Sequence, residues 1–304
     1  MEYCAKADFM EIACGSRHGK SVVCLGLLAL VVLAFDCPSD ANAAPIPVAW
    51  WRMNEATSGP ISVGQIQDFG SGGNSTNLVF GDPNWMTAGV LTDPPFADGR
   101  GIFTDDLTDA IDFGQGAGGE LRITGDLTLW GRVKLGFSGG ASIAEKSSSG
   151  TGSYRLLVTE GSSPSGPSGG VSFSVSELGG TFDHNLIASA GSFPTTDWFD
   201  IAAVFCTSSG GGSNDGVISL YRNGDLVVSE SHDLTGIFDS TKAFDLGNSL
   251  PLSIEQFRVY DQALTSDEVR SLTIPEPSAL LLCLMGSLAV LGSRGRLRLA
   301  RPGH

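Results

Sequence analysis

Short stretches in which hydrophobic and polar residues alternate recur through the middle of the chain. Between Leu127 and Leu135, for example, four apolar side chains fall on one face. Since successive side chains of a β-strand point to opposite faces, this spacing predicts strands with one buried side. The strands predicted in this way cover residues 127–135, 171–176, 217–222, 226–229 and 254–260.

Two local signals indicate how these strands connect and where they stop. Asn223 and Gly224 separate two predicted strands, and this pair suits a type I′ hairpin turn because both central residues need a positive φ. Thr265 and Glu268 have the spacing of a helix capping box just ahead of Val269. A string of strands followed by one short helix predicts an all-β sandwich.

The composition agrees with a turn-rich domain that has a real core. Of 304 residues, 41 are Gly, which turns favour, and hydrophobic residues make up 41%. Residues 44–274 contain 11 Lys and Arg and 27 Asp and Glu, so their charge is 11 − 27 = −16. Such an acidic domain repels phosphate backbones, which argues against nucleic-acid binding. Its carboxylates either keep the domain soluble or hold divalent cations.

The positions of the cysteines argue against a disulfide or a zinc–cysteine cluster in the central domain. Four of the six lie before residue 38, Cys283 lies near the C-terminus, and Cys206 alone falls in between. A single thiol forms neither an intradomain disulfide nor a zinc–cysteine cluster. Cys206 ends an apolar run and is predicted to be a strand residue.

The first 43 residues have the pattern of an export signal. An uncharged apolar run at 21–35 follows a positively charged region, and Ala41 and Ala43 supply the small residues of a cleavage site. Cleavage is expected after Ala43. The alternative is an N-terminal membrane anchor, for which an apolar run of about 15 residues is short.

The C-terminal segment 273–304 combines three features in order, and the series resembles the PEP-CTERM sorting signal. A Pro-Glu-Pro motif is followed by an apolar segment of about 15 residues, predicted to be a helix, and then by a cluster of arginines. The resemblance implies recognition by an exosortase-like membrane protease, with transient anchoring in the inner membrane. The alternative is a plain C-terminal anchor. The motif residues are Pro275, Glu276, Pro277, Arg294, Arg296 and Arg298.

Residues 44–272 resemble the LamG-like jelly roll of the concanavalin A-like lectin/glucanase superfamily. The similarity lies in an ordered series: an aromatic-rich strand at 48–55, a Gly-rich loop at 68–74, a strand opened by Trp198 and a closing strand with a capped helix at 254–265. The resemblance implies a jelly-roll β-sandwich. Where the family usually has Ile-Asp-Glu, this chain has Ile254-Glu255-Gln256, so no metal-binding role is carried over to that position.

Calcium is the cofactor that the sequence supports best. Asp68 and Asn74 lie in the Gly-rich loop and offer the oxygen ligands that calcium prefers, and some members of the family bind calcium. The alternative is an Asx turn that stabilises the loop.

No catalytic residues are predicted. Glycoside hydrolysis needs two carboxylates about 5–10 Å apart, and no strand carries such a pair on one face. Asp105, Asp106, Asp109 and Asp112 cluster in sequence, but this segment reads as a solvated or calcium-binding loop. Matches to a nucleophile elbow at 166–170 and to a dinucleotide fingerprint at 114–119 lack the required helices. The histidines of the domain, His184 and His232, are expected at the surface.

The sequence therefore predicts an exported protein of the cell surface or extracellular matrix, with a non-catalytic module that binds glycans, such as exopolysaccharide, or proteins. Trp85 is a candidate for stacking on sugar rings, with a core position as the alternative. Two other functions remain open: a secreted glycan-active hydrolase on the same fold, and a purely structural surface protein.

Overall fold

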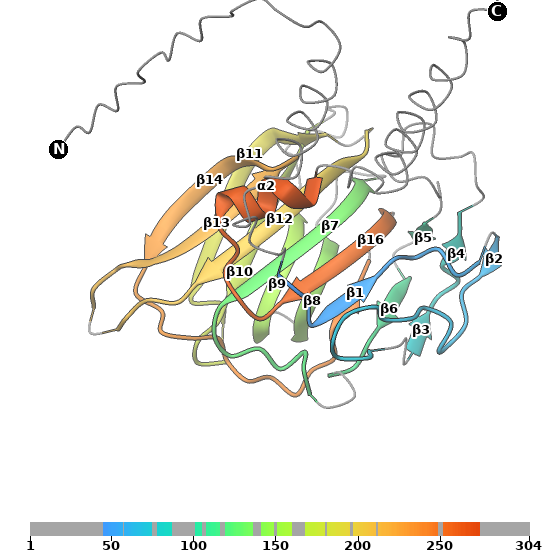
Figure 1. Cartoon of the computed structure of the whole chain (residues 1–304), viewed down its shortest axis with the longest axis horizontal. Coiled ribbons are helices and arrows are strands. Elements are labelled where there is room, and N and C mark those ends of the chain that lie inside the picture. Colours follow the sequence, from blue (N-terminus) through green and yellow to red (C-terminus); the bar gives the residue numbers. More distant parts are fainter. Residues whose placement is uncertain are drawn as a thin grey trace, which may run out of the picture. The chain divides into compact units, whose positions relative to one another are not determined.

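The chain folds into two antiparallel β-sheets that pack face to face, as Figure 1 shows. The computed structural model describes residues 45–273, which belong to one compact unit, Ala44–His304. Within that range the gaps are residues 57, 75–77, 87–100, 105–107, 116–118, 136–140, 149–150, 160–167, 180, 195–196, 211 and 249–251.

Each sheet combines hairpin-connected neighbours with strands that are distant in sequence. The nine-stranded sheet runs β14 (Asp225–His232), β13 (Gly216–Arg222), β12 (Phe199–Cys206), β7 (Leu127–Leu135), β16 (Leu252–Tyr260), β5 (Ile102–Thr104), β4 (Asn84–Trp85) and β2 (Gly59–Pro60), with β1 (Ala49–Trp51) also paired to β16. The seven-stranded sheet runs β11 (His184–Pro194), β10 (Ser168–Val175), β9 (Thr151–Thr159), β8 (Ala141–Ser148), β15 (Asp245–Leu246), β6 (Ala110–Asp112) and β3 (Leu78–Phe80).

The core lies between the two sheets and is built from alternate residues of their strands. Its centre is aromatic: the ring of Trp51 stacks on that of Phe113 at 3.9 Å and lies 5.6 Å from that of Phe244. Phe244 precedes β15 and also lies 6.1 Å from Phe257 of β16. Both sheets therefore contribute rings to one cluster, which holds β1 in place.

The outer face of the nine-stranded sheet carries a second, smaller core under the helix α2 (Ser266–Thr273). Val269 and Leu272 of the helix pack with Trp130 of β7, Tyr221 of β13 and Tyr260 of β16. This explains why β7 is buried on both faces, whereas its alternation predicted one exposed side.

The predicted elements are confirmed where they are described. β7 spans the predicted residues, and Asn223 and Gly224 turn with φ of 51° and 81°. In the capping box, the Thr265 backbone N–H donates to Glu268 Oε2 at 2.7 Å and the Glu268 N–H donates to Thr265 Oγ1 at 3.3 Å. Cys206 ends strand β12, as expected.

Candidate functional site

Strand β1 carries two adjacent tryptophans that point to opposite faces of its sheet, as alternation requires. Trp51 is fully buried in the main core, where its Nε1 donates to the Asn74 carbonyl at 2.8 Å. Trp50 is half-buried on the outer face, where its Nε1 donates to Gln256 Oε1 at 3.2 Å. One tryptophan therefore serves packing, whereas the other is presented at the surface.

Trp50 stands between two guanidinium groups. Cross-strand pairing places Trp50, Arg258 and Trp130 side by side on β1, β16 and β7. The Arg258 guanidinium lies 4.3 Å from the Trp50 ring centroid and 5.0 Å from that of Trp130. The Arg52 guanidinium also lies 4.3 Å from the centroid of the Trp50 ring, and it lies 5.0 Å from the centroid of the Phe69 ring. We call these five residues, Phe69, Arg52, Trp50, Arg258 and Trp130, the Arg–aromatic ladder.

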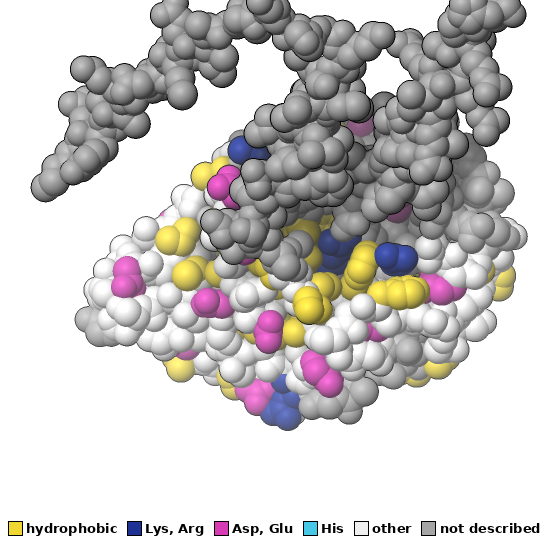
Figure 2. Space-filling view, viewed as in Figure 1, with side chains coloured by type: hydrophobic (Ala, Val, Ile, Leu, Met, Phe, Trp, Pro, Cys, Tyr) yellow, Lys and Arg dark blue, Asp and Glu magenta, His cyan; other side chains and the backbone are white. Residues whose placement is uncertain are grey.

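The outer part of the ladder is accessible. Arg52 is exposed, and 47% of Phe69 is exposed. Figure 2 shows Lys or Arg side chains and hydrophobic side chains next to one another on this face, over β16 and β1. A surface with rings and guanidinium groups offers both stacking area and hydrogen-bond donors to a ligand.

The Gly-rich loop predicted at 68–74 positions Phe69 beside Trp50. The Phe69 N–H donates to the Trp50 carbonyl at 2.7 Å, and the two rings meet edge-on at 6.3 Å. Gly70 packs flat on β1, since a Cβ there would lie 2.7 Å from the Ala49 Cα. The loop therefore needs a glycine at this close approach.

Asp68 and Asn74, the predicted calcium residues, do come together in this loop. Asp68 Oδ1 accepts the backbone N–H groups of Trp50 and Gly70, both at 2.6 Å. Its Oδ2 accepts the Asn74 backbone N–H at 2.7 Å and the Asn74 side-chain Nδ2 at 3.0 Å. The carboxylate is thus surrounded by N–H donors, as in a loop-closing Asx arrangement. Calcium binding stays a prediction.

Replacing Asp68 with alanine is expected to lower the free energy of unfolding by about 2–3 kcal/mol, because buried N–H donors lose a charged acceptor. Chemical denaturation with and without calcium measures this. Asp197→Ala, at an exposed position, is the control and should change stability by less than about 0.5 kcal/mol. A calcium-dependent rise in the wild-type melting temperature that Asp68→Ala abolishes would instead identify a metal site.

A second polar feature lies on the outer face of the seven-stranded sheet. Asp245 of β15 is the cross-strand partner of both Asp112 of β6 and Glu145 of β8, so the three carboxylates form one row. We call Asp112, Asp245 and Glu145 the carboxylate row. Asp112 Oδ1 accepts the Gly114 N–H at 2.5 Å, whereas Glu145 accepts Asn248 Nδ2 at 2.6 Å and Ser147 Oγ at 2.8 Å.

Asp245 is the member of the row whose ionised carboxylate is destabilised by its surroundings. Burial, followed by the charges of Asp112 and Glu145, raises its pKa to about 7, against an opposing effect of Lys146. Its Oδ1 is buried without a hydrogen bond from the described residues. Within those residues, no three His, Cys, Asp or Glu side chains are grouped so that they would hold a metal ion. The row was missed in the sequence because its members come from three strands.

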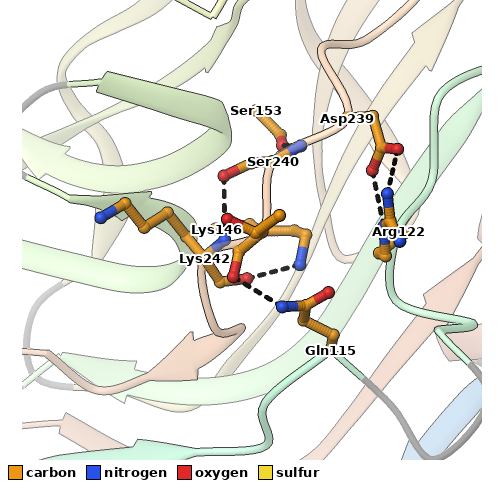
Figure 3. Close-up of polar contacts among 8 residues, drawn as sticks. Gln115, Arg122, Lys146, Ser153, Asp239, Ser240 and Lys242 are labelled. Atoms are coloured by element: carbon orange, nitrogen blue, oxygen red, sulfur yellow. Dashed lines mark hydrogen bonds and ion pairs between the residues drawn. The ribbon is translucent and has the colours of Figure 1, made fainter.

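Lys146, next to this row on β8, is fully buried. Figure 3 shows it with its polar partners. Its Nζ donates to the Lys242 carbonyl at 2.6 Å. Burial, aided by the charge of Arg122, lowers its pKa to about 8. The same loop is held by the Ser240 N–H, which donates to Ser153 Oγ at 3.3 Å, and by the ion pair of Arg122 with Asp239. Lys146 thus ties a loop to the sandwich.

Other candidate residues lie elsewhere or play packing roles. Asp109 is buried and its Oδ1 accepts the Asp82 N–H at 2.8 Å, while Asp105 and Asp106 lie outside the described residues. Trp85 is 3% exposed, so it takes the core alternative rather than sugar stacking.

His232 was expected at the surface, and this expectation is wrong. It ends β14, is buried, and stacks on Phe205 with ring centroids 4.7 Å apart. Its ring also lies 5.5 Å from that of His184. Burial and the nearby His184 lower the pKa of His232. The last side chain of β14 turns inward because Leu234 N–H donates back to His232 Nδ1 at 3.2 Å.

The two predicted targeting segments lie outside the described residues. These segments include Ala41 and Ala43, the Pro275-Glu276-Pro277 motif and the arginines from Arg294 onward. Within the described part of the chain, no helix is long and apolar enough to cross a membrane.

Sequence comparison decides the family. The model of the concanavalin A-like lectin/glucanases superfamily, Laminin_G_3, matches residues 108–270, more than half of the chain. The chain belongs to this superfamily. Its two stacked antiparallel sheets are the concanavalin A-like jelly roll. A comparison with curated proteins finds no match.

Two of the solved structures with a similar fold are botulinum neurotoxin binding domains. The binding domain of botulinum neurotoxin DC in complex with SialylT has a TM-score of 0.51 at 12% identity, covering 76% of this chain and 51% of that one. The botulinum neurotoxin serotype G binding domain gives 0.51 at 13% identity, with the same coverage of 76% and 51%. At this identity the likeness concerns the fold, and this chain spans about half the length of each.

Proposed function

We propose that this chain is an exported protein of the cell surface or extracellular matrix, whose jelly roll is a non-catalytic glycan-binding module. The Arg–aromatic ladder carries the proposal. The exposed ring of Phe69 offers an apolar face on which a sugar ring packs, and the guanidinium of Arg52, held over the Trp50 ring, offers N–H donors to its oxygen atoms. The structural neighbours are described as binding domains, which agrees with a module that binds rather than reacts.

Glycan binding is tested by applying the full-length chain to a glycan array, with calcium and with EDTA. We expect saturable binding that Trp50→Ala reduces at least tenfold, since the central ring of the ladder is removed. A loss of binding in EDTA would support the calcium prediction at Asp68 and Asn74. An array without any bound glycan would contradict the proposal and favour a protein-binding or purely structural surface component.

The proposal places the chain outside the cell. The export signal at 1–43 and the sorting tail at 273–304 support this localisation, with an exosortase-like protease as partner and transient anchoring through the apolar helix. A chain with alanines at Pro275, Glu276 and Pro277 is expected to stay in the membrane fraction, whereas the unaltered chain leaves it. Cell fractionation measures this, and equal distributions of the two chains would contradict exosortase sorting.

A glycan-active hydrolase is the second candidate, and the carboxylate row favours it. Directly opposed residues on neighbouring strands have Cβ atoms about 5 Å apart, which suits a pair of catalytic carboxylates. Asp245, with its pKa raised to about 7, would be the acid and Glu145 the second carboxylate. Release of reducing sugar from a polysaccharide panel, abolished by both Asp245→Asn and Glu145→Gln, would establish hydrolysis. Binding without turnover would exclude it for that panel.

A further inference from the structure

The Arg–aromatic ladder concentrates positive charge in a domain that is otherwise acidic. Residues 44–274 have 11 Lys and Arg against 27 Asp and Glu, yet Arg52 and Arg258 flank the same indole at 4.3 Å each. Among the described residues, the ion pairs involve Arg122, Arg132, Arg270 and His184 but neither ladder arginine. Arg258 interacts with the charge of Asp200, whereas the described contacts of Arg52 are with rings alone, so an anion that meets the N–H edge of Arg52 would be stabilised.

The acidic side chains nearest in sequence and strand are engaged by other groups. Asp68 is occupied by N–H donors of its own loop and of Trp50. Glu255 of β16 and Asp200 of β12 pair with Arg132 at 2.9 Å and 3.1 Å, and Glu55, three positions after Arg52, accepts the Gln67 N–H at 2.9 Å. The described neighbourhood therefore leaves the charge of Arg52 uncompensated.

The stacked geometry leaves the hydrogen-bonding edge of Arg52 available. A guanidinium that lies over a ring uses its flat face for the contact, whereas its N–H donors lie in the guanidinium plane. The Nη2 of Arg258 donates a hydrogen bond to Gln256 Oε1 at 3.2 Å. Arg52 is exposed and makes its described contacts with rings only. It is the member of the ladder best placed to meet a carboxylate.

We propose that the ladder binds a carboxylate-bearing sugar, so that the glycan recognised by this domain is an acidic one. The sugar ring packs on the exposed Phe69, and its carboxylate pairs with the exposed guanidinium of Arg52, while Arg258 adds positive charge at the Trp50 ring. This inference rests on the glycan-binding function proposed above. Charge complementarity selects the ligand class: a neutral sugar would leave the charge of Arg52 unpaired, whereas the carboxylate of a uronate neutralises it.

The test is calorimetric titration of the full chain with tri-galacturonic acid and with its fully methyl-esterified form, which has the same rings but no charge. We expect the acid to bind at least tenfold more tightly than the ester, and to weaken as salt is raised. Arg52→Gln should lower the affinity for the acid about tenfold, and Arg258→Gln should lower it less, because Arg258 is half-buried and bonded to Gln256. Arg270→Gln, at an exposed arginine on α2 paired with Asp225, removes the same charge elsewhere and should leave the affinity unchanged.

The possible results distinguish a failure of this inference from a failure of the proposed glycan binding. Equal binding of acid and ester, or array binding without binding of either trisaccharide, overturns the acidic ligand and leaves glycan binding standing. Binding of the acid that neither Arg52→Gln nor Arg258→Gln weakens overturns the ladder as the site. An absence of binding to every glycan overturns both. Melting temperatures of the variants, matched to wild type, show that any lost affinity is not lost folding, and Arg52→Gln is the safer variant because Arg52 is exposed.

Discussion

Replacing Trp51 with alanine is expected to lower the free energy of unfolding by about 3–5 kcal/mol. Trp51 is fully buried, stacks on Phe113 at 3.9 Å, and donates to the Asn74 carbonyl at 2.8 Å. Its removal leaves a cavity between the sheets and frees the loop that holds Phe69. Urea denaturation followed by tryptophan fluorescence and circular dichroism measures the loss.

Trp50 is the matched control, since it has the same side chain one position away. Trp50→Ala removes a half-buried ring from the outer face, so it should cost less than half as much stability as Trp51→Ala while it removes glycan binding. Equal destabilisation by the two substitutions would contradict the assignment of Trp51 to the core and Trp50 to the site.

Replacing Asp245 with asparagine is expected to stabilise the domain at pH 8 by up to about 4 kcal/mol, since each tenfold change in proton affinity is worth about 1.4 kcal/mol. Burial and the like charges of Asp112 and Glu145 raise the pKa of Asp245 from its ordinary value of 3.8 to about 7. The folded protein therefore holds this proton more tightly than the unfolded chain does. The stabilisation that this tighter proton binding by Asp245 provides is fully present below pH 3.8 and is lost as the pH rises through 7.

The pH dependence distinguishes this effect from ordinary packing. The gain from Asp245→Asn should be largest at pH 8 and should shrink as the pH is lowered toward 4, because wild-type Asp245 is then neutral as well. Thermal unfolding at pH 4.5 and pH 8 measures both values. Asp225→Asn serves as control, since this exposed carboxylate pairs with Arg270 and its loss should be neutral or slightly destabilising. A gain that is the same at both pH values would contradict the raised pKa.

Several elements could be predicted from the sequence because their causes are local. The strand at 127–135 follows from alternation, the hairpin turn at Asn223 and Gly224 from the need for positive φ, and the start of α2 from the capping box at Thr265. In each case the signal lies within a few residues. The superfamily could be inferred for the same reason, as an ordered series of such local patterns.

The candidate site was only partly predictable. The Gly-rich loop with Asp68 and Asn74 was identified, with calcium binding and an Asx turn as alternatives, because the sequence does not reveal that N–H groups of Trp50 and Gly70 surround the carboxylate. From the sequence, Trp50 and Trp51 were both assigned to one aromatic-rich strand. Alternation assigns them to opposite faces, but which face is the core depends on the partner sheet.

The other features of the site depend on pairing between strands that are far apart in the sequence. Trp50 and Gln256 are 206 positions apart, and β1 meets β16 only because the closing strand returns to the first. Asp112, Glu145 and Asp245 form a row because three strands distant in sequence align in register, and Lys146, in a stretch that reads as polar surface, is buried by the loop at Lys242. Sequence by itself therefore determined the strands, turns and family through short-range backbone preferences. Only the tertiary structure decided which side chains share a face, because burial and charge coupling arise between strands that the chain connects at a distance.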